Sequence, residues 1–82
     1  MQAMNETELG RAIRARRKEL GVTQKELALA CGTGVRFIID LERGKSTVQI
    51  GKALQVIRGL GMAVEVRPAH AGGPVDDSGR TG

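Results

Sequence analysis

The sequence has very few aromatic side chains: one Phe, no Tyr and no Trp among 82 residues. Any hydrophobic core must therefore be built from Leu, Ile, Val, Ala and Met. A chain of this length has a large surface relative to its core and is only marginally stable alone, and association with another chain is one remedy. The composition predicts a single small aliphatic domain.

Cysteine and histidine occur once each, as Cys31 and His70, in different segments. A lone cysteine cannot form an internal disulfide, which fits a reducing compartment, and we interpret Cys31 as a small, half-buried helix residue. His70 has no second ligand at metal-binding spacing, and no Ser, His and Asp are arranged as in a hydrolase. The Gly32-Thr33-Gly34 turn is too short for a nucleotide-binding loop. We therefore expect no enzyme, no metal and no cofactor.

Long apolar runs are also missing, since none approaches the length of a membrane span. Residues 1–10 lack the pattern of a signal peptide. These two absences predict a cytoplasmic protein that does not contact a membrane.

Positive charge is concentrated in the middle of the chain. The net charge is +4, but the stretch from Leu9 to Arg58 carries eleven Lys and Arg against four acidic residues. A compact domain with a charge of about +7 favours a polyanion as its partner, most simply nucleic acid. A solvated basic surface is the alternative that charge alone leaves open.

The stretch from Thr23 to Lys45 has the pattern of two short helices joined by a tight turn. Thr23 with Glu26 three residues later forms a capping box, and Gly32 stands where a chain takes a left-handed φ after a helix. Thr33 is expected to cap the second helix, which runs to about Arg43. Two helices joined by a turn of about three or four residues are the sequence form of a helix-turn-helix, whose second helix can enter a DNA major groove.

Flanking helices are predicted on both sides of this motif. One runs from a Thr7 cap to Leu20 and ends at Gly21, a suitable residue after a helix C-terminus. The other is expected to be capped by Ser46 or Thr47 and to end near Gly59. Residues 6–60 then form one helical domain.

After Gly61 the period changes to two. Met62, Val64 and Val66 alternate with small or charged residues up to Pro68, which predicts a short strand over residues 61–67. A single strand in a helical chain has no internal partner, so we expect it to pair with another copy or with a second protein. An extended tail without pairing is the alternative. Residues 1–5 are expected to form a flexible arm, and residues 68–82, rich in Gly and polar residues, to be disordered.

Several positions of the motif resemble the helix-turn-helix of the Xre/Cro/C1 group, which includes the lambdoid phage repressors. Gln24 opens the first motif helix, Ala28 is the small residue between crossing helices, and Gly32 lies at the turn. The run from Leu41 to Lys45 is similar to the segment that ends and follows the recognition helix in this family. The resemblance covers about residues 9 to 60 and implies an all-α, four- to five-helix, lambda-repressor-like DNA-binding domain.

This resemblance implies two kinds of DNA contact. Phosphate contacts position such a protein, whereas contacts to base edges specify sequence. The residues expected at phosphates are Gln24, Lys25, Arg43, Lys45 and Ser46. The residues expected near base edges are Thr33, Gly34, Val35, Arg36, Phe37 and Asp40.

Among the expected base contacts, Arg36 is the leading one, since a guanidinium can bind guanine O6 and N7 together. Val35 could contact a thymine methyl group. Asp40 could accept from a cytosine amino group or orient Arg36 from four residues away. Phe37 could contact the DNA or pack against the preceding helix. Arg17 and Glu42 resemble a family ion pair that ties the first helix to the end of the recognition helix.

The C-terminal residues 61–67 narrow the resemblance to HipB-type antitoxins. There, strands of two subunits pair, the homodimer binds an operator, and the antitoxin binds a HipA-like kinase toxin. Three interpretations remain open on the sequence: an antitoxin that represses its own operon, a stand-alone Xre-type repressor, and a toxin-neutralising module without specific DNA binding.

Overall fold

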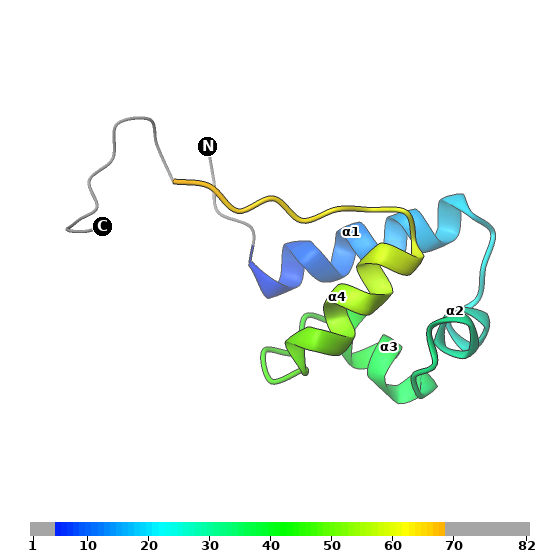
Figure 1. The fold of residues 1–82 in the computed structure, drawn as a ribbon. Helices are drawn as coiled ribbons and strands as arrows, with labels where there is room; N and C mark the ends of the chain where they lie inside the picture. Colours follow the sequence, from blue (N-terminus) through cyan, green and yellow to red (C-terminus); the bar gives the residue numbers. More distant parts are fainter. Residues whose placement is uncertain (1–4, 69–82) are drawn as a thin grey trace.

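The computed structural model describes residues 5–68 and contains four helices. They are α1 (Glu6–Glu19), α2 (Gln24–Cys31), α3 (Val35–Glu42) and α4 (Ile50–Gly59) (Figure 1). Helix α3 packs against both α1 and α2, and α4 packs against α2. The predicted all-α architecture is confirmed. The predictions for residues 1–4 and 69–82, His70 included, lie outside the described residues.

Local hydrogen bonds define the starts of α1 and α2. In α1, Asn5 is the N-cap: its side chain accepts from the Glu8 N–H at 2.8 Å, and its own N–H donates to Glu8 Oε1 at 3.2 Å. The expected Thr7 cap is therefore wrong, because Asn5 and Glu8 already form a capping box two residues earlier. In α2 the predicted box is confirmed, with the Glu26 N–H donating to Thr23 Oγ1 at 3.0 Å.

Helices α3 and α4 begin later than the sequence indicates. Gly34 is the N-cap of α3, and the Thr33 hydroxyl donates to the Gly34 carbonyl at 3.3 Å instead of capping the helix. Gln49 is the N-cap of α4, so the expected caps at Ser46 and Thr47 are wrong, since both lie in a turn before it. Neither α3 nor α4 has a side-chain cap hydrogen bond, so packing against neighbouring helices must stabilise their ends.

The core is aliphatic, as the composition predicts. Ile13, Ile38, Val56 and Leu60 are its largest fully buried side chains. Cys31 is also buried, at 8% exposure, rather than half-buried as expected, and burial raises the pKa of its thiol. A buried thiol held in its protonated form suits packing rather than chemistry.

Gly10 permits an unusually close approach of α1 to α3. A Cβ at this position would lie 2.5 Å from the Glu42 carbonyl oxygen and 2.6 Å from that of Leu41. Both atoms are backbone and cannot rotate away. The two helices therefore meet closely only because residue 10 has no side chain.

Gly10→Ala should therefore lower the free energy of unfolding by about 1–3 kcal/mol, as overpacking of a filled interior does. A matched control is Gly51→Ala in α4, where an added Cβ meets no atom within 4 Å. That change should be neutral or stabilising by up to about 1 kcal/mol. Urea unfolding of both variants tests this, and equal effects would show that the close approach does not limit packing.

After α4 the chain reverses and runs back in the direction of the α1 N-terminus (Figure 1). The Met62 N–H still donates to the Ile57 carbonyl at 3.0 Å, but residues 62–68 then continue in an extended conformation without a backbone ladder. Within residues 5–68 no β-strand is formed, and intermolecular pairing of this segment stays a prediction. No helix of the described part of the chain is long and apolar enough to cross a membrane.

Candidate nucleic-acid interface

Helix α3 turns its apolar side inward and its polar side outward. Ile38 and Leu41 are buried on the inner side. On the outer side, Gly34 and Val35 are exposed, and the Arg36 side chain is 76% exposed. Of the six residues expected near base edges, these three are therefore accessible, whereas Thr33, Phe37 and Asp40 are half-buried.

Asp40 lies between two cations. Its carboxylate is 3.7 Å from Arg36 Nε and 3.6 Å from Lys45 Nζ, and its side chain is only 20% exposed. The Lys45 N–H also donates to the Asp40 carbonyl at 3.0 Å, which fixes the loop after α3 against the helix. This geometry favours the interpretation that Asp40 orients Arg36 over a direct contact with cytosine.

Phe37 packs inward. It is partly buried against the hydrophobic core, and the Lys52 ammonium of α4 lies 5.9 Å from the centroid of its ring. An ammonium at this distance from an aromatic face makes a cation–π contact. The structure thus shows Phe37 packed against the core, with a contact to Lys52 that the sequence did not indicate, and a contact of Phe37 with DNA stays a prediction.

The N-terminus of α2 presents unused hydrogen-bond donors. The capping box engages the N–H groups of Thr23 and Glu26. The N–H groups of Gln24 and Lys25 precede the first intrahelical bond and have no helical acceptor. The same box lowers the pKa of Glu26, first through the Thr23 backbone N–H. Two free N–H groups at the positive end of a helix suit a phosphate oxygen.

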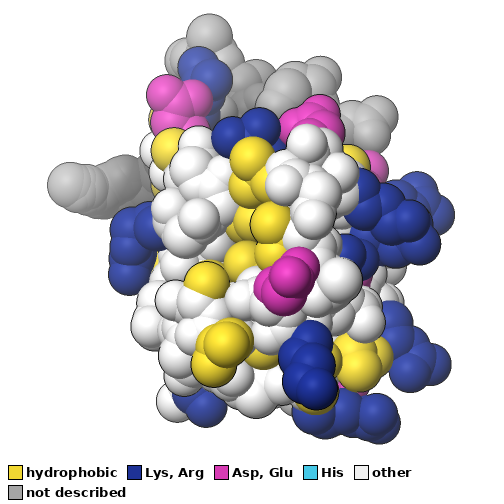
Figure 2. All heavy atoms as spheres, turned by 90° about the vertical axis from the view of Figure 1, so that its right-hand side faces the viewer, with side chains coloured by type: hydrophobic (Ala, Val, Ile, Leu, Met, Phe, Trp, Pro, Cys, Tyr) yellow, Lys and Arg dark blue, Asp and Glu magenta, His cyan; other side chains and the backbone are white. Residues whose placement is uncertain are grey.

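The loop after α3 supplies cations on the other side of the helix. Arg43, Lys45 and Ser46 are exposed. The chain turns there at Gly44, whose φ of 81° favours glycine. Figure 2 shows Lys and Arg side chains along the margins of the face on the α2 side of the molecule, with apolar and acidic side chains between them.

Arg17 and Glu42 are brought together as a buried ion pair. Arg17 Nε donates to Glu42 Oε2 at 2.6 Å and Arg17 Nη2 to Oε1 at 3.1 Å, with side chains 9% and 3% exposed. Arg17 Nη1 also donates to the Val22 carbonyl at 2.8 Å. The hydrogen bond with Glu42 raises the pKa of Arg17.

Gln24 also forms a hydrogen bond with this ion pair, a contact that the sequence did not indicate. Its Nε2 donates to Glu42 Oε1 at 3.1 Å, although the two residues lie 18 positions apart. The bond connects the first residue of α2 with the last residue of α3. No local pattern reports such a contact, because it depends on how the two helices cross.

Comparisons with known proteins place the chain among helix-turn-helix regulators. The helix-turn-helix family model matches residues 13–66. An HTH-type transcriptional regulator named y4mF, from Sinorhizobium fredii, is 49% identical over 59 residues, covering 72% of this chain and 78% of that protein. Another HTH-type transcriptional regulator, from Methanothermobacter thermautotrophicus, is 45% identical over 49 residues, covering 60% of this chain and 71% of that protein.

Among solved structures, the HipA-HipB-O2-O3 complex contains a similar fold, with a TM-score of 0.76 and 20% identity over 85% of this chain and 99% of that one. The clp gene regulator ClgR from C. glutamicum has a TM-score of 0.63 and 32% identity, covering 76% of this chain and 80% of that one. The chain is a member of the helix-turn-helix family of transcriptional regulators.

Proposed function

We propose that this protein is a sequence-specific transcriptional repressor that inserts α3 into the major groove of an operator. The observation that carries this proposal is the outward surface of α3, where Val35 and the 76% exposed Arg36 side chain project beside a fixed Asp40. Arg36 binds a guanine, and Val35 contacts a thymine methyl group. Asp40 holds Arg36 in place.

Phosphate contacts flank α3 on both sides in this arrangement. At the α2 N-terminus, the side chain of Gln24 and the free N–H groups of Gln24 and Lys25 bind one phosphate region. After α3, Arg43, Lys45 and Ser46 bind another. These contacts fix the depth and the register of α3 but carry no sequence information.

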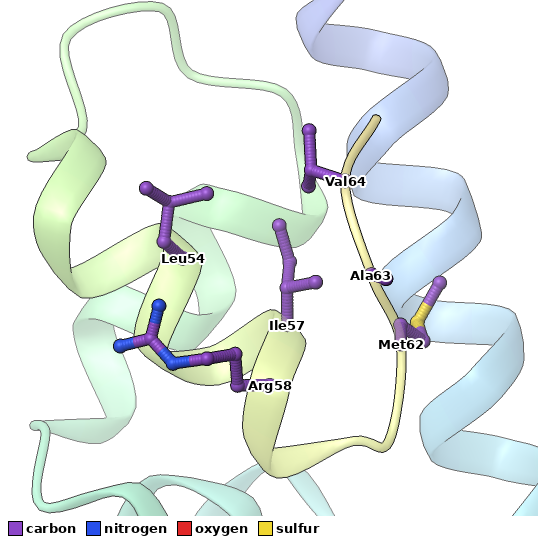
Figure 3. A pocket seen from close by; sticks show the side chains of 6 residues that line it. All are labelled: Leu54, Ile57, Arg58, Met62, Ala63 and Val64. Atoms are coloured by element: carbon purple, nitrogen blue, oxygen red, sulfur yellow. The ribbon is translucent and has the colours of Figure 1, made fainter. Parts of the chain in front are cut away.

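The protein acts as a homodimer in this proposal. A groove of about 250 Å³ lies between α4 and the extended segment. Figure 3 shows the side chains of both that line it. Val64 and Val66 are 52% and 92% exposed, so these two apolar side chains lack cover within residues 5–68. Pairing of residues 62–67 between two copies would satisfy the backbone and cover these side chains. It would also place two α3 helices about 34–36 Å apart, one turn of DNA.

We further propose that the protein is the HipB-like antitoxin of a toxin–antitoxin operon, with a HipA-like kinase toxin as its second partner. The support is the likeness of the whole described fold to chains of HipB complexes, among them the HipA-HipB-O2-O3 complex and the HipB-O4 20mer complex. The antitoxin represses its own promoter and binds the toxin at the same time.

An electrophoretic shift on the protein's own upstream DNA, with and without the product of the adjacent gene, tests this function. A specific shift that the neighbour's product strengthens is the expected result. A specific shift that is indifferent to the neighbour would leave a stand-alone repressor. Tight binding to the neighbour without any specific shift would contradict DNA recognition and leave a toxin-neutralising module.

Arg36→Ala and Gln24→Ala should weaken DNA binding in different ways. Loss of the Arg36 side chain should remove about 1–3 kcal/mol of discrimination at one base pair and thus relax sequence preference. Loss of the Gln24 side chain should weaken binding to all sequences alike. Competition assays with operator and scrambled DNA measure both effects, and the reverse pattern would show that the two roles are exchanged.

A further inference from the structure

The hydrogen bond between Gln24 and Glu42 connects the core ion pair to the candidate phosphate site. Glu42 Oε1 accepts both from Arg17 Nη2 and from Gln24 Nε2, each at 3.1 Å. The Glu42 side chain is 3% exposed, whereas Gln24 is half-buried and stands at the first position of α2. The Gln24 side chain therefore lies at the edge of the surface and donates a hydrogen bond to the buried carboxylate of Glu42.

The chemistry of this contact determines which way the Gln24 amide is turned. A carboxylate paired with Arg17 only accepts hydrogen bonds, so the amide must present its NH₂ group to Glu42 and not its oxygen. That group carries two hydrogens, and Glu42 accepts only one of them at Oε1. The second remains available, and a phosphate oxygen is likewise an acceptor only.

We propose that Glu42 is a positioning residue for DNA binding, which holds the Gln24 amide so that its second N–H donates to a DNA phosphate. This inference rests on the proposed function, since it assigns how the phosphate contact of Gln24 is made. Glu42 does not touch DNA. It acts through Gln24, and the two hydrogen bonds from Arg17 hold its carboxylate in place.

Such positioning should increase affinity because the Gln24 side chain is already ordered before DNA arrives. A free glutamine on the surface would lose rotamer freedom on binding. Immobilising one such side chain weakens association about threefold to tenfold. The phosphate hydrogen bond itself adds to the effect of losing Gln24, since hydrogen bonds to charged groups are among the strong ones.

The test must remove the carboxylate without leaving Arg17 as an unpaired buried charge. The double substitution Arg17→Met with Glu42→Leu replaces the pair by apolar side chains and leaves the net charge unchanged. Such replacements of buried ion pairs are often neutral or stabilising. Gln24→Ala is then made in both the wild-type and the doubly substituted protein, and the affinity of all four proteins for operator and for scrambled DNA is measured by fluorescence anisotropy.

The expected result is coupling between the two sites. In the wild-type background Gln24→Ala should weaken binding about tenfold or more per subunit on both DNA sequences. In the Arg17→Met/Glu42→Leu background the loss should be about threefold to tenfold smaller, because Gln24 must then be ordered when it binds the phosphate. Arg17→Lys, which retains the Glu42 carboxylate, should preserve the full effect of Gln24→Ala. An equal loss on Gln24→Ala in the wild-type and the doubly substituted backgrounds would overturn the proposal.

A second measurement needs no variant and no DNA. In the NMR spectrum of the free protein, one Nε2 proton of Gln24 should be shifted downfield relative to those of the exposed Gln49, for which no side-chain bond is seen among residues 5–68. Averaged Gln24 amide signals like those of Gln49 would overturn the proposal. A downfield Gln24 signal in a protein that binds no DNA specifically would instead contradict the repressor function, so the two failures can be told apart.

Discussion

Replacing Glu42 by alanine should lower the free energy of unfolding by about 3–5 kcal/mol, because Arg17 then stays buried without a partner. The pair is almost fully enclosed, with side chains 9% and 3% exposed, and Glu42 receives hydrogen bonds from both Arg17 and Gln24. Small domains have a total stability of about 5–15 kcal/mol. The variant should therefore melt far below the wild-type protein or be unfolded at 37 °C. Thermal unfolding followed by circular dichroism measures the shift.

The matched control is Glu19→Ala, which removes the acid of an exposed ion pair. Arg16 and Glu19 are 3.3 Å apart, with side chains 38% and 67% exposed. Because solvent screens such pairs, this change should cost less than about 1 kcal/mol. Arg16 also donates to the Leu60 carbonyl at 2.9 Å and keeps that partner. A melting curve of Glu42→Ala that matches the wild type would refute a structural role for the buried pair.

The affinity for DNA should fall about 10⁴-fold when the salt concentration rises from 50 to 200 mM. If each subunit of a dimer meets about four phosphates, the slope of log K against log salt is near −7, at roughly −0.9 per phosphate. The exposed cations Lys25, Arg43 and Lys45 stand on the two sides of α3 where such contacts are expected. Fluorescence anisotropy titrations at four or five KCl concentrations give the slope directly.

Two comparisons show whether the dependence on salt comes from phosphate contacts. Scrambled DNA should bind more weakly than the operator but with a similar dependence on salt, since phosphates carry no sequence information. Lys25→Ala should reduce the magnitude of the slope by about 2 for a dimer, one phosphate contact per subunit. A flat response to salt would argue against phosphate binding on both sides of α3.

Features that depend on neighbours a few residues apart follow from the local sequence. The Thr23–Glu26 capping box and the left-handed turn at Gly32 were predictable, because a hydroxyl three residues from a helix N–H and a residue without Cβ act locally. The aliphatic composition determined the kind of core.

Tertiary structure decided what local patterns leave undetermined. Thr33, Ser46 and Thr47 were plausible caps, but packing set the starts of α3 and α4 at other residues. Asp40 could have faced DNA or Arg36, and only the folded loop brings Lys45 to its other side.

Gln24 and Glu42 are 18 residues apart in the sequence and come into contact only because α2 and α3 cross. Residues 62–68 are a second segment whose structure the local sequence does not determine. Their alternating pattern was visible in the sequence, but a strand exists only when its backbone groups find a partner, and residues 5–68 of one chain do not provide it.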